Sequence, residues 1–367
     1  MRAERDNWID SVKGISILAV IMPHAKLYEL PGISGVLCSF GQYFIIPFLI
    51  ISSYLSFFSY HRHIASGGSL CGWYYKKLIR LIPLYYLALF ISYFGGGDSF
   101  WLGQEGHVTC LNLITHLLFI HGLFPHYSNS IIGVEWYLSV LVLFYLFVPL
   151  LNKYVNTIQK SFFSCVVSIL FVTIISTIAL HFGYNGSDRY IYAAFINKFS
   201  LWAEIPVLLL GLCFFRIKPL WDDFPIRPLY VWIALGTVVF FLIGQALNKN
   251  TLFGVGDLYL CSVFFFLILL FLSKLDLISD VVVFKPFRQL GVNSYALYLF
   301  HPFVYSLVKL CLGDLVVDAS QSVGWLLVSY LLAACLTYVL SLLLMRFFDK
   351  PIRRVLYDLS SSGSCNN

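Results

Sequence analysis

Residues 5–28 read RDNWIDSVKGISILAVIMPHAKLY, a largely apolar stretch whose ionisable side chains include Lys13 and His24. A helix that crosses a bilayer needs about 20 mostly apolar residues, and this run is long enough. It follows two arginines, as a signal peptide would, but it has no small-x-small cleavage site and contains Pro23. We therefore expect residues 8–28 to form a retained first transmembrane helix.

The apolar character of this run continues along the chain. Of the 367 residues, 59% are hydrophobic and 11% are charged, whereas a soluble domain carries about 25% charged residues. Mean hydropathy is +0.83. The sequence predicts an all-α, polytopic integral membrane protein with about ten transmembrane helices in one bundle. The candidate spans lie near residues 8–28, 40–60, 78–95, 136–153, 162–182, 200–216, 228–247, 258–274, 290–311 and 323–347.

The positions of the basic residues indicate the orientation. If the N-terminus is cytoplasmic, 19 of the 24 Lys and Arg residues fall at cytoplasmic ends or loops, as the positive-inside rule requires. The C-terminus is then cytoplasmic too. The longest loop, about residues 96–135, has no Lys or Arg and is expected outside. We expect one transmembrane domain over residues 1–355 and a short polar tail over residues 356–367.

Residues 110–124 form a shorter apolar run that contains two histidines. We interpret it as an interfacial or re-entrant segment, with an eleventh span as the alternative. An eleventh span would invert every later loop and would remove the charge asymmetry.

Other function classes are disfavoured by composition and motifs. The net charge of +6 is distributed in short clusters between apolar runs, so we expect no nucleic-acid partner. The nine cysteines form no CxxC or Cys/His pattern, and the outer-loop histidines lack close metal-ligand spacing, so we predict no metal. Phosphate-loop, dinucleotide and GxSxG fingerprints are absent from the sequence.

The first helix carries the strongest candidate for chemistry. Lys13 and His24 are eleven residues apart, about three turns plus 20°, so they share one helix face. They are separated by about 16 Å along the axis. Ionisable groups inside a span are usually functional, and a histidine can act as general base for a hydroxyl nucleophile. Alternatively, Lys13 extends to the interface and His24 bonds a neighbouring helix.

A compact cationic cluster, Lys76, Lys77 and Arg80, precedes the third span. Lys77 and Arg80 are three residues apart and lie on one helix face. Such a cluster suits a phosphate-bearing ligand. It could equally be a topology signal.

Two further groups are candidates on the outer side. Glu135 and Trp136 begin the fourth span, and a carboxylate beside an indole can hold a sugar. An interface anchor is the alternative for the tryptophan. Ser294, Tyr298 and His301 follow i, i+4, i+7 spacing and form one polar stripe, which could also serve interhelical hydrogen bonding.

Together these motifs resemble the membrane-bound acyltransferase 3 family over nearly the whole chain. The motifs that carry the resemblance are Asp10 with Lys13-Gly14 and His24, Lys77-x-x-Arg80-x-x-Pro83, Trp136-x-Leu138 with Phe144-Tyr145 and Pro149, Ser294-Tyr-x-x-Tyr298-x-x-His301, and Asp349-Lys-Pro351-x-Arg353. Members of this family O-acylate polysaccharides and other extracytoplasmic acceptors.

The resemblance implies roles for particular residues. In the family an arginine precedes the histidine by eleven positions, and the pair is associated with acyl-coenzyme A. Lys13 occupies that position here and keeps the charge without the bidentate guanidinium. Lys77 and Arg80 stand where the family has paired arginines. Some members carry a glutamate five residues after the tryptophan, where this chain has Leu141.

The residues and the resemblance lead to one mechanistic hypothesis. Acyl-coenzyme A, expected to be acetyl-CoA, binds through its phosphates to Lys13, Lys76, Lys77 and Arg80, and His24 is the catalytic residue. Glu135, Trp136 and the polar stripe line the acceptor side.

The expected partners are acyl-CoA, membrane lipid and a surface polysaccharide or its lipid-linked precursor, such as O-antigen, capsule or exopolysaccharide. The expected location is the cell inner or plasma membrane. A polytopic glycan polymerase or glycosyltransferase is the first alternative, and it would be expected to place cationic groups outside, whereas this chain places its clusters inside. A secondary transporter is the second alternative, and it would show two paired halves, which the sequence does not show.

Overall fold

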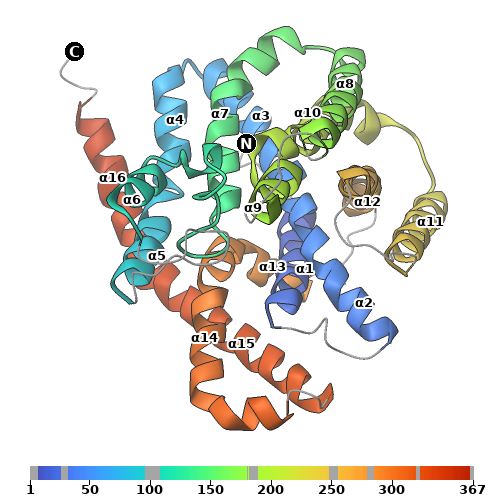
Figure 1. Ribbon diagram of the computed structural model, residues 1–367. Helices are drawn as coiled ribbons and strands as arrows, with labels where there is room; N and C mark the ends of the chain where they lie inside the picture. Colours follow the sequence, from blue (N-terminus) through green and yellow to red (C-terminus); the bar gives the residue numbers. More distant parts are fainter. Residues whose placement is uncertain are drawn as a thin grey trace.

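The computed structural model describes residues 7–25, 32–95, 108–179, 181, 189–247, 255–278, 285–319 and 323–363. All regular structure in these residues is helical (Figure 1). The α-helices are α1 (Asn7–His24), α2 (Ile33–Phe40), α3 (Ile45–Ala65), α4 (Leu70–Ile79), α5 (Ile82–Gly95), α6 (Cys110–Leu117), α7 (Trp136–Tyr154), α8 (Ile158–Ile178), α9 (Arg189–Ala194), α10 (Leu201–Asp223), α11 (Pro228–Leu247), α12 (Val255–Ile278), α13 (Lys285–Val292), α14 (Ser294–Ala319), α15 (Val323–Leu344) and α16 (Lys350–Gly363). Short 3-10 or π turns are η2 (Gly41–Phe44), η3 (His121–Leu123), η5 (Phe195–Phe199) and η7 (Met345–Asp349).

Helix α1 is fixed by an unusually close approach to α13. A Cβ atom on Gly14 would lie 2.0 Å from the Phe287 carbonyl oxygen, and one on Gly291 would lie 1.6 Å from the Asp10 carbonyl oxygen. Only glycine lets two helix backbones approach in this way, as small residues do between helices in membranes. The two helices therefore pack backbone against backbone over the first half of α1.

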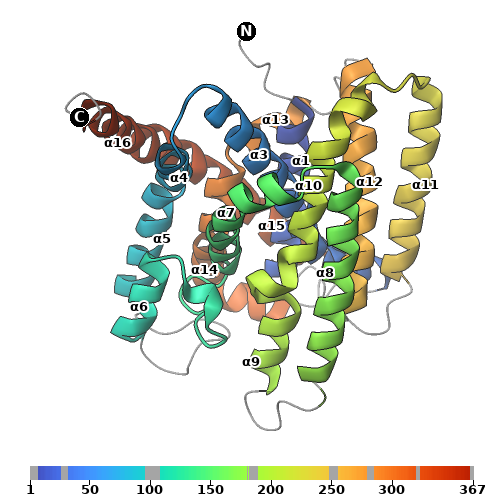
Figure 2. The ribbon, with the colours of Figure 1, turned by 90° about the horizontal axis from the view of Figure 1, so that it is seen from above.

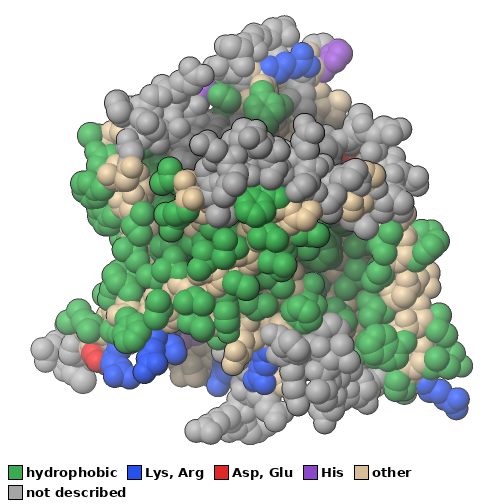
Figure 3. All heavy atoms as spheres, turned by 90° about the horizontal axis from the view of Figure 1, so that it is seen from below, with side chains coloured by type: hydrophobic (Ala, Val, Ile, Leu, Met, Phe, Trp, Pro, Cys, Tyr) green, Lys and Arg blue, Asp and Glu red, His purple; other side chains and the backbone are tan. Residues whose placement is uncertain are grey.

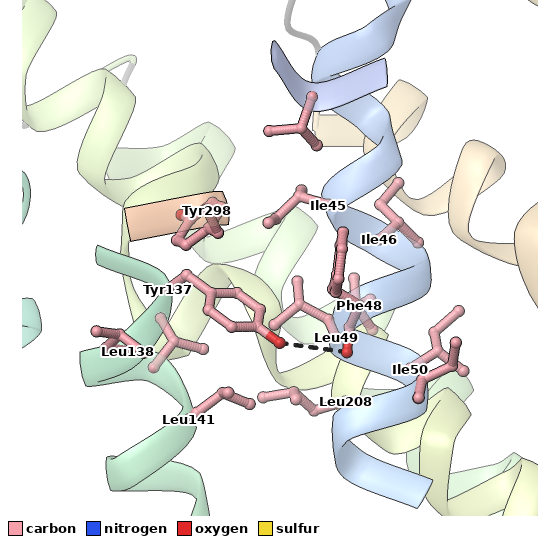
Figure 4. Close-up of a cluster of buried hydrophobic side chains, with 14 of the residues drawn as sticks. Ile45, Ile46, Phe48, Leu49, Ile50, Tyr137, Leu138, Leu141, Leu208 and Tyr298 are labelled. Atoms are coloured by element: carbon pink, nitrogen blue, oxygen red, sulfur yellow. Dashed lines mark hydrogen bonds between the residues drawn. The ribbon is translucent and has the colours of Figure 1, made fainter. Parts of the chain in front are cut away.

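Apolar side chains from many helices form the core of the bundle. Figure 4 shows Phe48 and Leu49 of α3, Leu208 of α10 and Tyr298 of α14 gathered around Tyr137 of α7. The Tyr137 hydroxyl donates to the Phe48 carbonyl oxygen at 3.3 Å and lies 2.8 Å from the Ser52 hydroxyl. A buried phenol needs such a partner, and this one ties α7 to α3.

Long apolar helices confirm the membrane character. Among the described residues, six helices are long and apolar enough to cross a bilayer, or seven if the bent pair α4–α5 counts as one span. Figure 3 shows a band of apolar side chains across one face, with Lys and Arg side chains along its lower rim and a second group at the upper edge. An apolar band between charged rims is the pattern a bilayer imposes.

The run at residues 110–124 does not cross the membrane. Helix α6 has eight residues, about 12 Å of rise, so it is far too short for a span. Leu111 and Ile114 of α6 and its C-cap Leu118 are exposed, by 59%, 50% and 60%, while Thr115 and His116 are buried. The eleventh span is therefore wrong, and the exposed stripe is that of an interfacial helix.

Several predicted boundaries differ from the structure. The span expected at 78–95 is broken, because α4 ends at Ile79 and α5 starts at Ile82 after a bend of 44°. Helix α1 ends at His24, and the rest of the expected first span lies outside the described residues. Helix α16 runs through residue 355, and the division into a transmembrane domain and a polar tail at that residue stays a prediction.

The two ends of the molecule carry different elements. In Figure 2, α4, α13 and α16 lie at one end of the bundle, and α6 and α9 lie at the other. This division separates the predicted cationic cluster, on α4, from the loop segment between α6 and α7.

Candidate functional site

His24 is the last residue of α1, eleven residues after Lys13 in one continuous helix. Its side chain is exposed, whereas most of the helix is buried. Pro23 has no N–H, so the carbonyl of Ala19, four residues earlier, lacks its usual helical partner. Gly41 of η2 packs against that carbonyl, and a Cβ there would lie 2.2 Å from the oxygen. The proline and the glycine therefore position η2 against the end of α1.

His301 of α14 lies directly beside His24. The two imidazole centroids are 4.7 Å apart and the rings meet at 71°, in edge-to-face contact. His301 is 1% exposed. The sequence placed both histidines on the outer side but did not pair them, because nothing in the spacing within α1 and α14 reveals the crossing of the two helices.

Pro302 fixes the orientation of His301. Because Pro302 lacks an N–H, the Tyr298 carbonyl four residues earlier is released from the helical ladder. The His301 Nδ1 atom lies 2.8 Å from that oxygen. A carbonyl only accepts, so Nδ1 carries the proton and Nε2 keeps its lone pair. Nε2 is buried and has no hydrogen-bond partner among the described residues, so it is available as a proton acceptor.

Tyr298 connects the histidine pair to the loop segment between α6 and α7. Its ring lies 6.2 Å from His301 and 5.5 Å from Tyr137, measured between centroids. Its hydroxyl donates to the carbonyl oxygen of Val134. The predicted polar stripe thus reaches the loop segment that carries Glu135.

Glu135 is completely buried and holds this loop together. Its carboxylate accepts from the backbone N–H groups of Ile131 at 2.7 Å and Val134 at 2.9 Å, and lies 3.2 Å from His116 Nε2. Burial alone would raise the pKa of Glu135. The hydrogen bond and charge of His116, the charge of His121 and the Ile131 N–H outweigh it and hold this pKa at about 2. The Glu135 carboxylate therefore forms its hydrogen bonds within the loop itself. Its contact with a sugar stays a prediction.

Two histidines missed by sequence reasoning complete this cluster. His116 and His121 stack in parallel with centroids 4.1 Å apart, and both are fully buried. His121 Nε2 donates to the Glu135 carbonyl oxygen at 3.3 Å. Burial, and then the neighbouring His116, lower the pKa of His121 well below its usual range. The described residues contain no group of His, Cys, Asp and Glu arranged to hold a metal ion, and the prediction of no metal stays a prediction.

Trp136 is buried between two aromatic rings. Its indole lies 6.3 Å from Tyr137 and 5.3 Å from Phe199 of η5. In this position it supports the packing of η5 against α7. Its stacking on a sugar stays a prediction.

The cationic cluster at the other end divides into buried and exposed members. Lys77 is buried, with its ammonium 5.4 Å from the Trp73 centroid, 5.2 Å from the Tyr145 centroid and 3.2 Å from the Ser56 hydroxyl. Cation–π contacts of this kind hold an ammonium out of water. Lys76 and Arg80 are exposed. Lys13 and Arg80 are near enough to interact electrostatically with Lys77.

The closing motif of the chain joins the same end. Asp349 is buried and forms a bidentate pair with Arg353, with oxygen–nitrogen distances of 2.9 and 2.8 Å. The Tyr295 hydroxyl donates to the Leu81 carbonyl oxygen, at the break between α4 and α5.

The predicted site residues fall into two groups. The structure gathers Lys13, Lys77 and Arg80 at one end, and His24, Tyr298 and His301 toward the other. Ser294 is buried at the start of α14, about 10 Å along the helix from His301.

The comparison with protein-family models identifies the family. A family model described as Acyltransferase domain, Acyl_transf_3, matches residues 6–346. The chain therefore belongs to the acyltransferase 3 family, as the sequence motifs predicted. Searches of curated proteins and of solved structures gave no match.

Proposed function

We propose that this protein transfers an acyl group, expected to be acetyl, from acyl-CoA to a hydroxyl of an extracytoplasmic glycan. Family membership supports the acyltransferase activity. The observation that carries the finer proposal is the His24–His301 pair, which one continuous helix links to the cationic cluster around Lys77. The two groups lie toward opposite ends of the molecule, as donor and acceptor sites on opposite membrane faces require.

The chemistry assigned to His24 is general base catalysis. Its imidazole accepts the proton of the acceptor hydroxyl while the oxygen attacks the thioester carbonyl. The tetrahedral intermediate then collapses, the carbon–sulfur bond breaks, and the proton passes to the leaving coenzyme A thiolate. The products are an ester and free coenzyme A. His301, with its Nε2 lone pair unengaged, supports the ring of His24 from the edge-to-face position.

The donor site is assigned to the cationic end. The exposed Lys76 and Arg80 can reach the phosphates of acyl-CoA, and Arg80 offers the bidentate geometry that phosphate prefers. Lys77 contributes charge from its aromatic surroundings, as Lys13 does from α1. Glu135 and Trp136 shape the acceptor side through the loop that they hold, and Ser294, Tyr298 and His301 line it.

The proposed membrane arrangement has about ten spans in the cell inner or plasma membrane, with both termini cytoplasmic. The six or seven long apolar helices and the position of α4 and α16 at one end of the bundle support this topology. The acceptor would be a surface polysaccharide such as O-antigen, capsule or exopolysaccharide, or its lipid-linked precursor. The polymerase and transporter alternatives lose support because the family model is that of an acyltransferase.

The test uses membranes that contain the protein, radiolabelled acetyl-CoA and the polysaccharide of the producing cell after mild alkaline removal of its esters. We expect base-labile label in the polysaccharide with the wild type and none with His24→Ala. The matched control is His126→Ala, a partly buried outer-loop histidine against Tyr192. Normal transfer by an inserted His24→Ala protein would refute the assignment of the base, and label in the wild type that never enters glycan would refute the acceptor.

A further inference from the structure

A lysine that neither the motifs nor the family resemblance singled out lies beside the end of α1. Lys198 belongs to the π-helix η5, and its ammonium lies 3.4 Å from the Gln42 side-chain oxygen. Gln42 directly follows Gly41, which packs on the Ala19 carbonyl and lies near Pro23 Cδ. Lys198 is therefore linked, through Gln42 and Gly41, to Pro23, the residue before His24.

The electrostatics of the site agree with this placement. Lys198 and His24 are near enough for their charges to interact. Lys198 also interacts with the carboxylate of Glu204, which is completely buried and whose two oxygens have no hydrogen-bond partner among the described residues. The Lys198 side chain is half-buried and keeps some exposed surface, whereas Glu204 keeps none.

A second anchor fixes the segment that carries Lys198. The ammonium lies 5.5 Å from the Phe199 centroid, and Phe199 packs on Trp136. Lys198 is therefore connected to His24 along two series of neighbouring residues. One passes through Gln42 and the Gly41–Pro23 contact. The other passes through Phe199, Trp136, Tyr137, Tyr298 and His301. Lys198 and His301 are thus linked to the end of α1 through different contacts.

We infer that Lys198 is a further catalytic residue, which stabilises the oxyanion of the tetrahedral intermediate beside His24. The inference rests on the proposed function. A cation next to a general base opposes the positive charge that the base acquires. That cost is offset when a negative charge develops between them, and the thioester carbonyl oxygen becomes negative as His24 takes the hydroxyl proton. Glu204 is near enough to interact electrostatically with this half-buried ammonium in the resting protein.

The rival explanation is that Lys198 and Glu204 serve only each other as a structural charge pair. The two explanations differ in a double variant. If the pair is structural, Lys198→Met with Glu204→Gln removes both charges together and restores activity. If Lys198 holds the oxyanion, the double variant stays slow, because the ammonium is still missing.

The experiment measures initial rates with radiolabelled acetyl-CoA and the de-esterified polysaccharide, each varied at saturation of the other. We expect Lys198→Met and the double variant to lower kcat about 10²- to 10³-fold with KM for both substrates changed less than about threefold. Lys198→Arg should recover part of kcat. The matched control is Lys218→Met, at the other end of the same helical segment, where Lys218 pairs with Asp222 at 2.8 Å. It should transfer at the wild-type rate.

The outcomes distinguish a failure of the oxyanion role of Lys198 from a failure of the proposed function. If wild type transfers label and Lys198→Met keeps its kcat, the oxyanion role is overturned and the proposed function stands. If the double variant recovers kcat, the structural pair is correct and the inference fails. A wild-type protein that transfers no label overturns both. If Lys198→Met does not insert, the double variant, which leaves no uncompensated buried charge, carries the comparison.

Discussion

The contact between α1 and α13 gives the sharpest prediction, because its geometry sets the positions of both histidines. A methyl group on Gly14 would lie 2.0 Å from the Phe287 carbonyl oxygen, whereas ordinary contact begins at 3.4 Å. Gly14→Ala therefore forces the two helices apart by about 1.4 Å, and neither partner is a flexible side chain. Helix α1 ends in His24, and α13 leads through Asn293 into α14, which carries His301.

The expected loss follows from this displacement. Misplacing reacting groups by about 1 Å costs about 10²-fold in rate, so Gly14→Ala should lower kcat about a hundredfold. Overpacking should also destabilise the protein by about 1–3 kcal/mol. Acetyl transfer and thermal unfolding in detergent measure the two effects. Gly236→Ala is the matched control, because a methyl there meets nothing within 4 Å. A Gly14→Ala protein that unfolds at the wild-type temperature and keeps its kcat would refute the close contact.

Three further predictions concern the loop, the histidine pair and the donor end. Stability should decrease as pH falls below about 6.5, because His121 is then protonated in the unfolded chain but not in the folded protein. It should decrease again between pH 4.5 and about 2, where protonation of Glu135 removes the stabilisation that its carboxylate provides. His121→Phe should make the first decrease in melting temperature smaller while a second decrease remains, and a profile that stays unchanged would contradict the assignment. Pro302→Ala restores an N–H that competes for the Tyr298 carbonyl, so kcat should fall about tenfold as His301 loses its fixed tautomer. An unaltered pH–rate profile in that variant would count against it. Arg80→Gln should raise KM for acetyl-CoA about tenfold with little change in kcat, since it removes a charged phosphate contact; a change confined to kcat would argue for a different role.

Much of the helical organisation could be predicted from local sequence. Apolar runs of the right length marked most of the long helices, and the absence of Lys and Arg in residues 96–135, with the shortness of residues 110–124, indicated a segment outside the membrane. The bend between α4 and α5 was missed, although Pro83, which has no N–H for the Ile79 carbonyl four residues earlier, marks the place where the helix breaks. The π-helices η5 and η7 were also missed, since nothing in their composition distinguishes them from α-helix.

The candidate site was predictable residue by residue but not as an assembly. The spacing of Lys13 and His24 in one helix was readable, because both positions are fixed by helix geometry. The contact of His24 with His301 depends on how α1 and α14 cross, which Gly14, Gly291 and Gly41 determine through tertiary packing. The stacked His116 and His121 lacked any local signal. Their pairing depends on the turn through η3 and on Glu135, whose carboxylate contacts His116 and whose backbone carbonyl accepts from His121.

The central claim is that donor and acceptor reach the His24–His301 pair from opposite faces of the membrane. The most direct measurement uses proteoliposomes of defined orientation, with radiolabelled acetyl-CoA on the face of α4 and α16 and de-esterified polysaccharide on the face of α6 and α9. We predict that label enters the polysaccharide in this arrangement and that exchanging the two compartments abolishes it. Equal transfer in both arrangements, or transfer only when both substrates share one compartment, would contradict the account.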